Sequence, residues 1–589
     1  MVVLKPQAEF GHAPPPQTPY SLITNLVSWD NTLGFREGDA AVLGRLVHIY
    51  PRFAPTHYGR ELSIAIAKKL GMEDKMALMF LNPVMWPHTR RHVALPERGV
   101  HALDPDADVQ YRCVELGSSD GNDRHRLYVT LFDPAKRAGI MLTWAAPGIG
   151  VSIRGAEMLL PLVDSMREVV PSLSSSSSSP AWSSPPEPTF TAENGSHAAL
   201  RERISSLLRR APRDPLAAQS RPEDVFLYPT GMAAVFHVNN ALREIRPGVV
   251  VVLGVVFHNT FTHLREECGG GWEHFGAVDE GGLDELEGWL DGEGEGGVDG
   301  EERQGRQRQR QRRGRDVSYL IVEFPGNPTL ETPDLKRLKK LSEKHSFVLI
   351  VDETVGTYAN VDVLPHADLL LTSLTKSFSG RADVMGGALA LNPSSPHHAT
   401  LSSFLAARHR NELFAPDADV LLRNSASFLQ RQAVLDTNAS LLAAHLFAAG
   451  VSDPSSPVTL VQHPSVPPSS SSKPAYDAHL RLPTPDHPSP GHGCLLTVEF
   501  EDVDSAKVFH DACGFYPSPH LGAHVTVQFA YNMATYGKRP GDREPMRRCG
   551  VREESVRVSV GLEDARDIID TVDVALEAAR KFKAERASK

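Results

Sequence analysis

The sequence predicts an α/β protein built on a mostly parallel, doubly wound sheet, followed by a smaller α+β domain. Residues 248–257, 317–324, 347–351 and 367–372 are short apolar runs rich in β-branched residues, which is typical of strands buried on both faces. Residues 333–345, between two of these runs, place Leu335, Leu338 and Leu341 at helical spacing. Strands that alternate with helices in this way form parallel sheets.

Three stretches of low complexity divide the chain of 589 residues. They contain too little apolar surface to offset the entropy of ordering, so we expect them to be unstructured. The first domain would be an α/β N-terminal extension, residues 1–170, with a helix at 61–70 and strands at 127–132 and 139–143. A Ser/Pro-rich linker, 171–195, leads to a large domain, 196–395, with an insert at 291–315. The C-terminal domain, 396–589, begins with long helices, carries a Pro/Ser-rich insert at 452–492 and ends with strands at 495–500 and 555–560.

Composition excludes several classes of protein. The net charge of −11, from 61 basic and 72 acidic residues, argues against a chain built around a nucleic acid. No apolar run reaches the roughly 20 residues that a membrane span needs. The five cysteines form no close pairs, so neither a disulfide framework nor a zinc ligand set is expected, and no other metal site is predicted. No signal peptide or presequence pattern is visible, and we expect a cytoplasmic protein without a membrane partner.

Reactive side chains follow two neighbouring strands of the predicted sheet. One apolar run ends at Asp352, and the next ends at the sequence Ser373-Leu374-Thr375-Lys376. Ligands of open α/β sheets bind at the carboxyl ends of the strands, where a crowded lysine can act as an amine nucleophile toward an aldehyde. A third element, Tyr228-Pro229-Thr230-Gly231-Met232, leads into a helix whose free N–H groups favour a phosphate. Each feature alone would be an ordinary surface charge or helix cap.

Together these motifs resemble the cystathionine γ-synthase branch of the pyridoxal-phosphate enzymes of Cys/Met metabolism, in particular its fungal form with a long N-terminal extension. The most specific piece is SLTKSFSG at 373–380, followed by Asp383 and Gly386-Gly387. PGNP at 325–328 and RVSVGLED at 557–564 add to it. The resemblance implies the fold type I of pyridoxal-phosphate transferases, pyridoxal 5'-phosphate as cofactor, amino-acid substrates and a homo-oligomer, usually a dimer of dimers.

The resemblance also assigns roles to residues. Lys376 would hold the cofactor covalently and shuttle protons, and Asp352 would pair with the pyridine nitrogen. The substrate carboxylate would lie on Arg557, with Thr526 where an assisting serine is usual. Gly231, Met232, Ser373 and Thr375 would bind the phosphate and Asn327 the ring oxygen. Tyr50 and Arg52 resemble an element that reaches the phosphate of the neighbouring subunit, which would place the active site at a dimer interface.

Two positions depart from the family pattern. Phe257 stands where most members stack a tyrosine on the cofactor ring, and it can still stack without supplying a hydroxyl. If the alignment is one residue off, His258 takes that place instead. His520 replaces the serine expected before Leu521-Gly522. Both departures concern substrate specificity rather than the cofactor.

The expected reaction is γ-replacement on an O-acyl-L-homoserine by L-cysteine, giving L-cystathionine for trans-sulfuration and methionine biosynthesis. The nearest alternative is γ-substitution by another sulfur or carbon nucleophile in fungal secondary metabolism, which Phe257 and His520 would favour. A nucleic-acid-binding loop at Arg303–Arg315 is a second class of function, although the acidic residues before it argue for self-neutralisation. A non-catalytic regulator on the same fold is a third.

Overall fold

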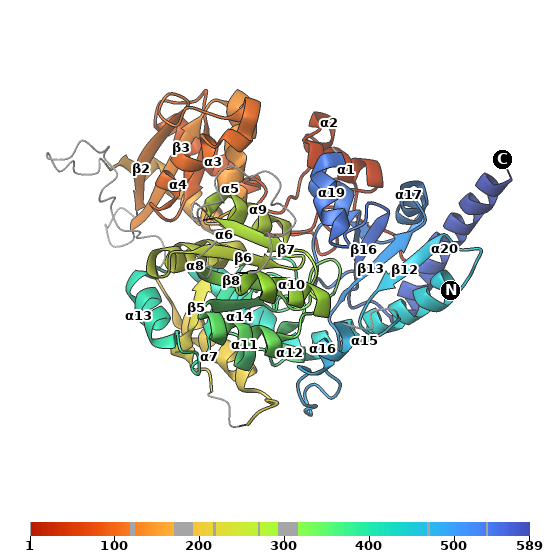
Figure 1. The fold of residues 1–589 in the computed structure, drawn as a ribbon. Coiled ribbons are helices and arrows are strands. Elements are labelled where there is room, and N and C mark those ends of the chain that lie inside the picture. Colours follow the sequence, from red (N-terminus) through yellow and green to blue (C-terminus); the bar gives the residue numbers. More distant parts are fainter. Residues whose placement is uncertain are drawn as a thin grey trace.

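The computed structural model describes residues 2–117, 124–169, 192–215, 219–268, 271–292, 316–467, 472–537 and 540–588. Within them the strands form three sheets, each in a unit of its own (Figure 1). Most of the linker at 171–195, nearly all of the insert at 291–315 and the arginine-rich Arg303–Arg315 lie outside the described residues.

The central unit contains the predicted parallel sheet, in the order β5-β11-β10-β9-β8-β6-β7. Only β11 runs antiparallel to its neighbours. Its strands are β5 (Val225–Tyr228), β6 (Val249–Leu253), β7 (Trp272–Phe275), β8 (Val317–Glu323), β9 (Val348–Asp352), β10 (Leu369–Thr372) and β11 (Gly387–Leu391). Its helices are α7 (Gly195–Arg209), α8 (Gly231–Ile245), α9 (His258–Glu267), α10 (Glu280–Leu290), α11 (Leu335–His345), α12 (Thr357–Asn360), α13 (His398–Arg408) and α14 (Ala415–Asn424).

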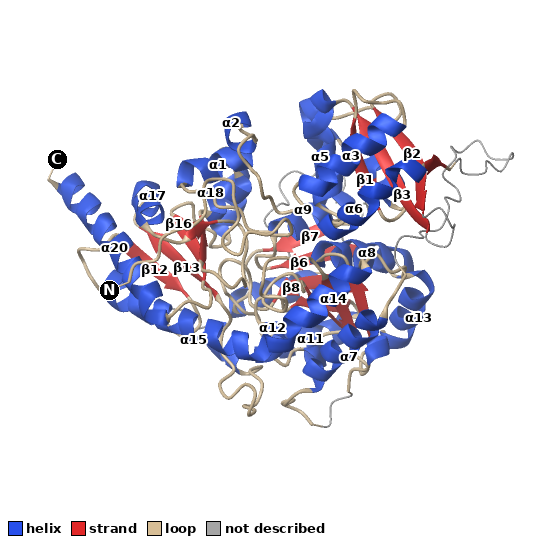
Figure 2. Ribbon diagram, turned by 180° about the vertical axis from the view of Figure 1, so that it is seen from behind, coloured by secondary structure: helices blue, strands red, loops and turns tan. Residues whose placement is uncertain are grey.

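Helices cover both faces of this sheet (Figure 2). Successive strand residues point to opposite faces, and β6 divides accordingly: Val250 and Val252 join one buried cluster, whereas Val251 and Leu253 join another. Burial on both faces explains why the strands read as continuous apolar runs. The predicted doubly wound α/β class is confirmed.

The N-terminal unit is an antiparallel sheet in the order β1-β3-β2-β4, covered by helices. Its elements are β1 (Met76–Phe80), β2 (Val109–Gly117), β3 (Arg124–Phe132), β4 (Arg167–Glu168), α3 (His57–Lys69), α4 (Met85–Val93), α5 (Arg137–Ala145) and α6 (Ile153–Leu159). The strand expected at 139–143 is wrong, because these residues belong to helix α5. There Ile140, Thr143 and Trp144 are buried at helical spacing.

The C-terminal unit is built on the sheet β12-β13-β16-β15-β14. Its elements are β12 (Val458–Gln462), β13 (Leu495–Phe500), β14 (Tyr516–Pro517), β15 (Val527–Phe529), β16 (Ser555–Ser559), α15 (Phe428–Leu446), α16 (Ser472–Asp477), α17 (Val503–Ala512), α18 (Tyr531–Tyr536), α19 (Pro540–Arg548) and α20 (Ala565–Ala587). The stretch 452–492 was expected to be unstructured, yet it contains β12 and α16. Tyr476 anchors it by stacking on Phe324 at 5.5 Å, and Arg481 donates to backbone carbonyls of the central unit.

The first 55 residues extend from the C-terminal unit to the N-terminal unit. The backbone amide of Leu4 donates to Thr571 in α20, and that of Trp29 donates to Asp511 in α17. Helix α1 (Trp29–Glu37) packs against α17 and α18 of the C-terminal unit, and α2 (Ala40–Leu43) packs against α1. The chain then crosses to the N-terminal unit and passes the carboxyl ends of the central strands on the way.

One helical stretch within the described residues, Ala415–Val451, is long and apolar enough by composition alone to cross a membrane. Its apolar residues Leu421, Leu435 and Leu442 are buried inside the protein. This is the pattern of a core helix.

Candidate active site

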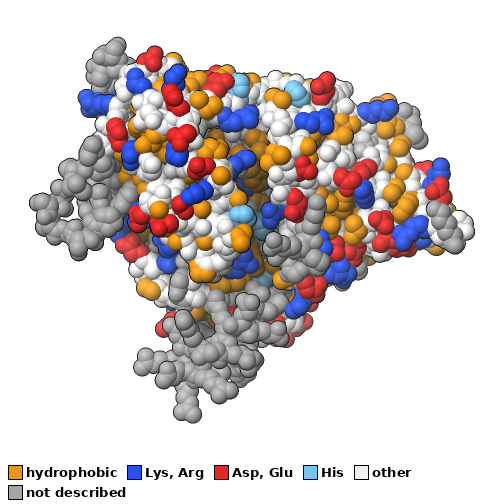
Figure 3. All heavy atoms as spheres, turned by 90° about the horizontal axis from the view of Figure 1, so that it is seen from above, with side chains coloured by type: hydrophobic (Ala, Val, Ile, Leu, Met, Phe, Trp, Pro, Cys, Tyr) orange, Lys and Arg blue, Asp and Glu red, His pale blue; other side chains and the backbone are white. Residues whose placement is uncertain are grey.

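Five parallel strands of the central sheet end at one edge, and the candidate residues follow them there. Asp352 is the last residue of β9, and Lys376 lies four residues beyond β10. The other three strands lead to Gly231 after β5, to Phe257 after β6 and to Glu323 as the last residue of β8. The surface is hollowed between the N-terminal and C-terminal units (Figure 3). The predicted meeting of these groups at the carboxyl ends of the strands is therefore found.

Asp352 is a buried carboxyl group held by a threonine. Its Oδ1 accepts hydrogen bonds from the Thr354 hydroxyl at 2.6 Å and the Thr354 backbone amide at 3.0 Å. The same hydroxyl accepts a bond from the backbone amide of Ser373, so it links the ends of β9 and β10. Burial raises the pKa of Asp352 to about 6, against the opposing effect of these hydrogen bonds. A buried carboxyl group of this kind is stabilised in its charged form by a cation beside it.

Glu323 is a site residue that sequence reasoning missed. Its two carboxylate oxygens accept the backbone amides of Phe257 at 2.5 Å and Asn327 at 3.1 Å. Burial and the neighbouring Asp352 raise its pKa well above the usual value. Glu323 thereby holds the backbone of two residues that the family pattern assigns to the cofactor, Phe257 to its ring and Asn327 to its ring oxygen. Its position at the end of an apolar run was the available signal.

The phosphate cradle is formed at the start of α8. Thr230 caps the helix by accepting the backbone amide of Ala233 at 2.9 Å. Gly231 lies so close to the loop after β10 that an added Cβ would be 2.9 Å from the Cβ of Ser373. Thr375 is fully buried, and its hydroxyl exchanges hydrogen bonds with the backbone of Gly386.

Tyr50 and Arg52 lie in the site of their own chain. The amine of Lys376 is 5.0 Å from the centre of the Tyr50 ring. The guanidinium of Arg52 lies 5.2 Å from the Phe257 ring centre. Gly148 lies next to both Arg52 and Met232: a Cβ added at Gly148 would be 3.3 Å from Arg52 Cδ and 3.4 Å from Met232 Cβ. Residues 46–55 cross between the two outer units and place this element beside Lys376 of the same chain, and its reach to a neighbouring subunit stays a prediction.

The amine and phenol groups at the centre have shifted pKa values. Burial lowers the pKa of Lys376, and Arg52 and Arg557 lower it further, against the opposing charge of Tyr50. Burial would raise the pKa of the Tyr50 phenol, but the charges of Lys376 and Arg52 and hydrogen bonds with Arg52 and Thr375 lower it. Each group is therefore easier to deprotonate than it is in water.

His520 lies beside Tyr50 in the candidate active site. Its ring centre is 6.2 Å from that of Tyr50, and neither of its nitrogens has a hydrogen-bond partner among the described residues. Burial lowers its pKa well below the usual value, and the charges of Lys376 and Arg557 add to this. A neutral imidazole replaces the serine that the family pattern led us to expect.

Arg557 is a buried arginine with one free donor. Its two Nη atoms donate to Asn327 Oδ1 at 3.1 Å and to the backbone carbonyls of Pro519 and His520. Its Nε has no partner within the described residues. An unpaired buried N–H is costly unless a ligand accepts it, so this atom fits a substrate carboxylate.

Thr526 does not contact Arg557 in the described structure, whereas Phe257 lies on the side of the candidate site. The Thr526 hydroxyl is bound to Glu563 at 2.8 Å and to the amide of Gly561, and no recorded contact of the described residues joins it to Arg557. The ring of Phe257 faces Arg52, whereas that of His258 packs edge-on against Tyr536 at 4.9 Å. Of the two candidates for stacking on the cofactor, the structure therefore places Phe257 toward the site.

The residues present fit pyridoxal phosphate. The buried carboxyl group of Asp352 matches a pyridinium, and the amine of Lys376 matches an aldehyde. The helix N-terminus beside Ser373 matches a phosphate, and the unpaired Nε of Arg557 matches a substrate carboxylate. This set on an α/β sheet of fold type I defines a pyridoxal-phosphate-dependent enzyme.

Comparison with known proteins supports a pyridoxal-phosphate-dependent enzyme. Residues 300–577 match the family model described as Cys/Met metabolism PLP-dependent enzyme. The chain is 31% identical to alanine racemase ungC of Aspergillus violaceofuscus, over 99% of both chains. It is 28% identical to the cystathionine gamma-synthase-like enzyme iboG2 of Amanita muscaria, over 97% of this chain and 96% of that one. A crystal structure of cystathionine gamma synthase from Xanthomonas oryzae has the same fold, with a TM-score of 0.50 and 21% identity over 66% of this chain and 87% of that one.

The chain belongs to the Cys/Met metabolism family of PLP-dependent enzymes, and its cofactor is pyridoxal 5'-phosphate.

Proposed function

We propose that the protein catalyses γ-replacement on an O-acyl-L-homoserine with L-cysteine, giving L-cystathionine and a carboxylic acid. The bond from Cγ to the ester oxygen breaks, and a bond from Cγ to the cysteine sulfur forms. One observation carries the proposal: Lys376 and Tyr50 both have a lowered pKa, the amine of Lys376 is 5.0 Å from the centre of the Tyr50 ring, and Arg557 has an unpaired Nε among the described residues. γ-Replacement needs several proton transfers beside an anchored α-carboxylate.

Each residue of the site has a separate role in the proposed reaction. When bound, the cofactor supplies an electron sink for negative charge developing at the substrate α-carbon. Asp352 keeps the ring nitrogen protonated, and Arg557 anchors the α-carboxylate through Nε. Lys376, as a neutral amine, takes and returns protons at the substrate carbons. Tyr50 is placed to protonate the departing carboxylate or to accept the proton of the incoming thiol.

The identity of the nucleophile is a separate part of the proposal. The relative iboG2 carries a cystathionine gamma-synthase-like name and spans nearly the whole chain, which supports γ-chemistry in general. Phe257 and His520 depart from the family pattern next to the reacting groups. Another sulfur or carbon nucleophile in place of cysteine is the variant of the proposal that these two residues favour.

Racemisation at the α-carbon is a second candidate, supported by a specific observation. The relative named alanine racemase is 31% identical over 99% of this chain. Racemisation needs one group that removes the α-proton and one that returns it on the other face. Lys376 with Tyr50 or His520 would supply such a pair, and no leaving group at Cγ would be involved.

One set of assays separates these candidates. The purified holoenzyme is given O-acetyl-L-homoserine with and without L-cysteine, and in parallel L-alanine in D2O, followed by chiral chromatography and mass spectrometry. Cystathionine that forms only when both substrates are present is the expected result. Formation of D-alanine with deuterium at Cα, and no release of acetate from the ester, would replace γ-replacement by racemisation. Acetate release without cystathionine would keep the γ-chemistry and reject cysteine.

A further inference from the structure

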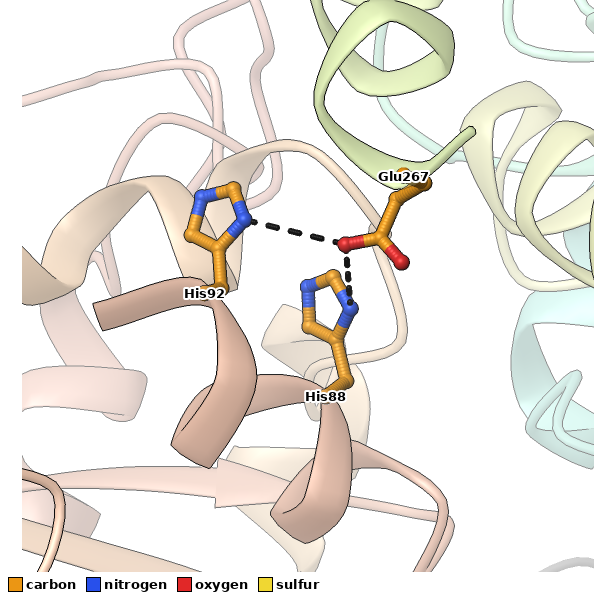
Figure 4. Close-up of side chains that lie close together, drawn as sticks. All are labelled: His88, His92 and Glu267. Carbon is orange, nitrogen blue, oxygen red and sulfur yellow. Dashed lines mark ion pairs between the residues drawn. The ribbon is translucent and has the colours of Figure 1, made fainter. Parts of the chain in front are cut away.

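A buried cluster of histidine and glutamate joins the N-terminal unit to the central unit, away from the candidate active site (Figure 4). His88 and His92 lie one turn apart on α4, and Glu267 is the last residue of α9. All three are at most 3% exposed, and together they form a group whose ligand atoms lie within 4.8 Å of one another.

The spacing within the cluster is that of metal ligands rather than of hydrogen-bond partners. Nδ1 of His88 is 3.3 Å from Oε1 of Glu267, and Nδ1 of His92 is 3.8 Å from the same oxygen. An N–H···O bond is usually about 2.7–3.2 Å long, and none of these three atoms has a hydrogen-bond partner within the described chain. Ligands about 2.0–2.1 Å from a tetrahedral zinc ion lie about 3.3–3.4 Å apart, which is close to the observed spacing.

A further histidine on α9 lies next to the cluster, outside the group whose ligand atoms lie within 4.8 Å of one another. His263 precedes Glu267 by four residues, so both side chains lie on one face of the helix. Its ring centre is 6.1 Å from that of His88, it is fully buried, and neither of its nitrogens has a hydrogen-bond partner among the described residues.

The surroundings orient these ligands. Nε2 of His92 lies on the outer side of the cluster, 3.4 Å from Oε2 of Glu266, whereas its Nδ1 faces Oε1 of Glu267. Arg98 contacts both His92 and Glu266. Arg91 pairs with the other oxygen of Glu267, Oε2, and the Arg91 side chain is 53% exposed, so water shares its charge. Oε1 remains available to a cation.

We propose that His88, His92 and Glu267 bind a structural zinc ion that fastens α4 to α9, with the neighbouring His263 as the candidate for the fourth ligand. Imidazole nitrogens with one carboxylate oxygen are a ligand set that Zn²⁺ favours. Helix α9 begins after Phe257 in the candidate active site and ends at this cluster. The ion would therefore hold the helix that carries Phe257 against the N-terminal unit.

The test measures metal content and thermal stability of the holoenzyme, purified without chelator from cells grown with zinc. We expect about one zinc ion per chain by mass spectrometry of the metal, and its loss in His92→Ala. The control His57→Ala removes an exposed histidine that faces Glu61 at 3.9 Å in the same unit, and it should retain the ion. Absence of zinc from the wild-type protein, or equal zinc in His92→Ala, would overturn the proposal.

A second measurement does not depend on a folded variant. Wild-type protein treated with a zinc chelator should melt at a lower temperature, and added Zn²⁺, but not Mg²⁺, should restore the original value. A melting temperature that does not change when the bound zinc is removed would also overturn the proposal. His57→Ala should respond to chelation as the wild type does.

Discussion

At the scale of single residues, we propose that the carboxyl group of Asp352 controls the charge of the cofactor ring. Asp352→Asn keeps the shape but cannot stabilise a protonated ring nitrogen, so we expect kcat/KM to fall about 10²–10³-fold, roughly 2.7–4 kcal/mol. Thr354→Val removes the hydroxyl bond to Asp352 and the bond accepted from the Ser373 amide, about 1 kcal/mol each, and should cost less than Asp352→Asn. Steady-state kinetics at saturating cofactor measures both variants. A loss in Thr354→Val as large as that in Asp352→Asn would contradict the assignment.

The lowered pKa of the Tyr50 phenol leads to a prediction about the pH dependence of kcat/KM. The charged and titratable groups that face it are Lys376, Arg52 and His520. If deprotonated Tyr50 is the base, kcat/KM rises with pH through its pKa. Arg52→Gln removes a cation that stabilises the phenolate, so the pKa rises and the ascending limb moves to higher pH.

Tyr50→Phe is the matched variant for this profile, because it removes the titrating group and should abolish the limb. Both variants are assayed at saturating cofactor over the whole pH range. An ascending limb that stays in place in both variants would show that another group titrates there.

At the scale of elements, the contact between α8 and the loop after β10 decides whether the phosphate cradle closes. Gly231→Ala places a methyl group 2.9 Å from the Cβ of Ser373, so the two elements must separate. Overpacking of this kind costs about 1–3 kcal/mol, and we expect the cofactor to bind at least about fivefold more weakly. Absorbance titration with pyridoxal phosphate measures the affinity.

Gly288→Ala in α10 is the control for this substitution, since an added Cβ there meets nothing within 4 Å. It should leave cofactor affinity unchanged and stabilise the helix by about 0.5–1 kcal/mol. If Gly231→Ala binds the cofactor as tightly as Gly288→Ala does, the cradle is not formed by this contact.

The elements also show how far the sequence could predict the structure. The strands of the central sheet were predictable because burial on both faces makes them continuously apolar, and Asp352 and Lys376 follow such strands. Residues 139–143 were mistaken for a strand because a short apolar run does not reveal its period. The contacts that Tyr476 and Arg481 make with the central unit involve residues far away in the chain, and so does the meeting of His88 with Glu267. Composition and local spacing carry no signal for either.

At the scale of the whole molecule, the first 55 residues connect all three units. They pack along the C-terminal unit, place Tyr50 and Arg52 beside Lys376, and then enter the N-terminal unit at α3. The guanidinium of Arg52 is anchored there by the carbonyl of Ala145 at the end of α5. Tyr50 and Arg52 therefore lie at the site of their own chain, and we propose that one chain supplies every group that binds the cofactor.

This arrangement predicts that two inactive variants cannot rescue each other. Arg52→Ala and Lys376→Ala chains with different tags are co-expressed, and mixed oligomers, if they form, are isolated through both tags. If subunits shared the site, the isolated mixed dimers would have about half of wild-type activity, because each mixed dimer has one intact site of two. We expect no recovery above the separate variants. As a control, a chain carrying both substitutions is co-expressed with wild type, and activity per wild-type chain should be unchanged. Recovered activity in the first mixture would show that Tyr50 and Arg52 act on a neighbouring subunit after all.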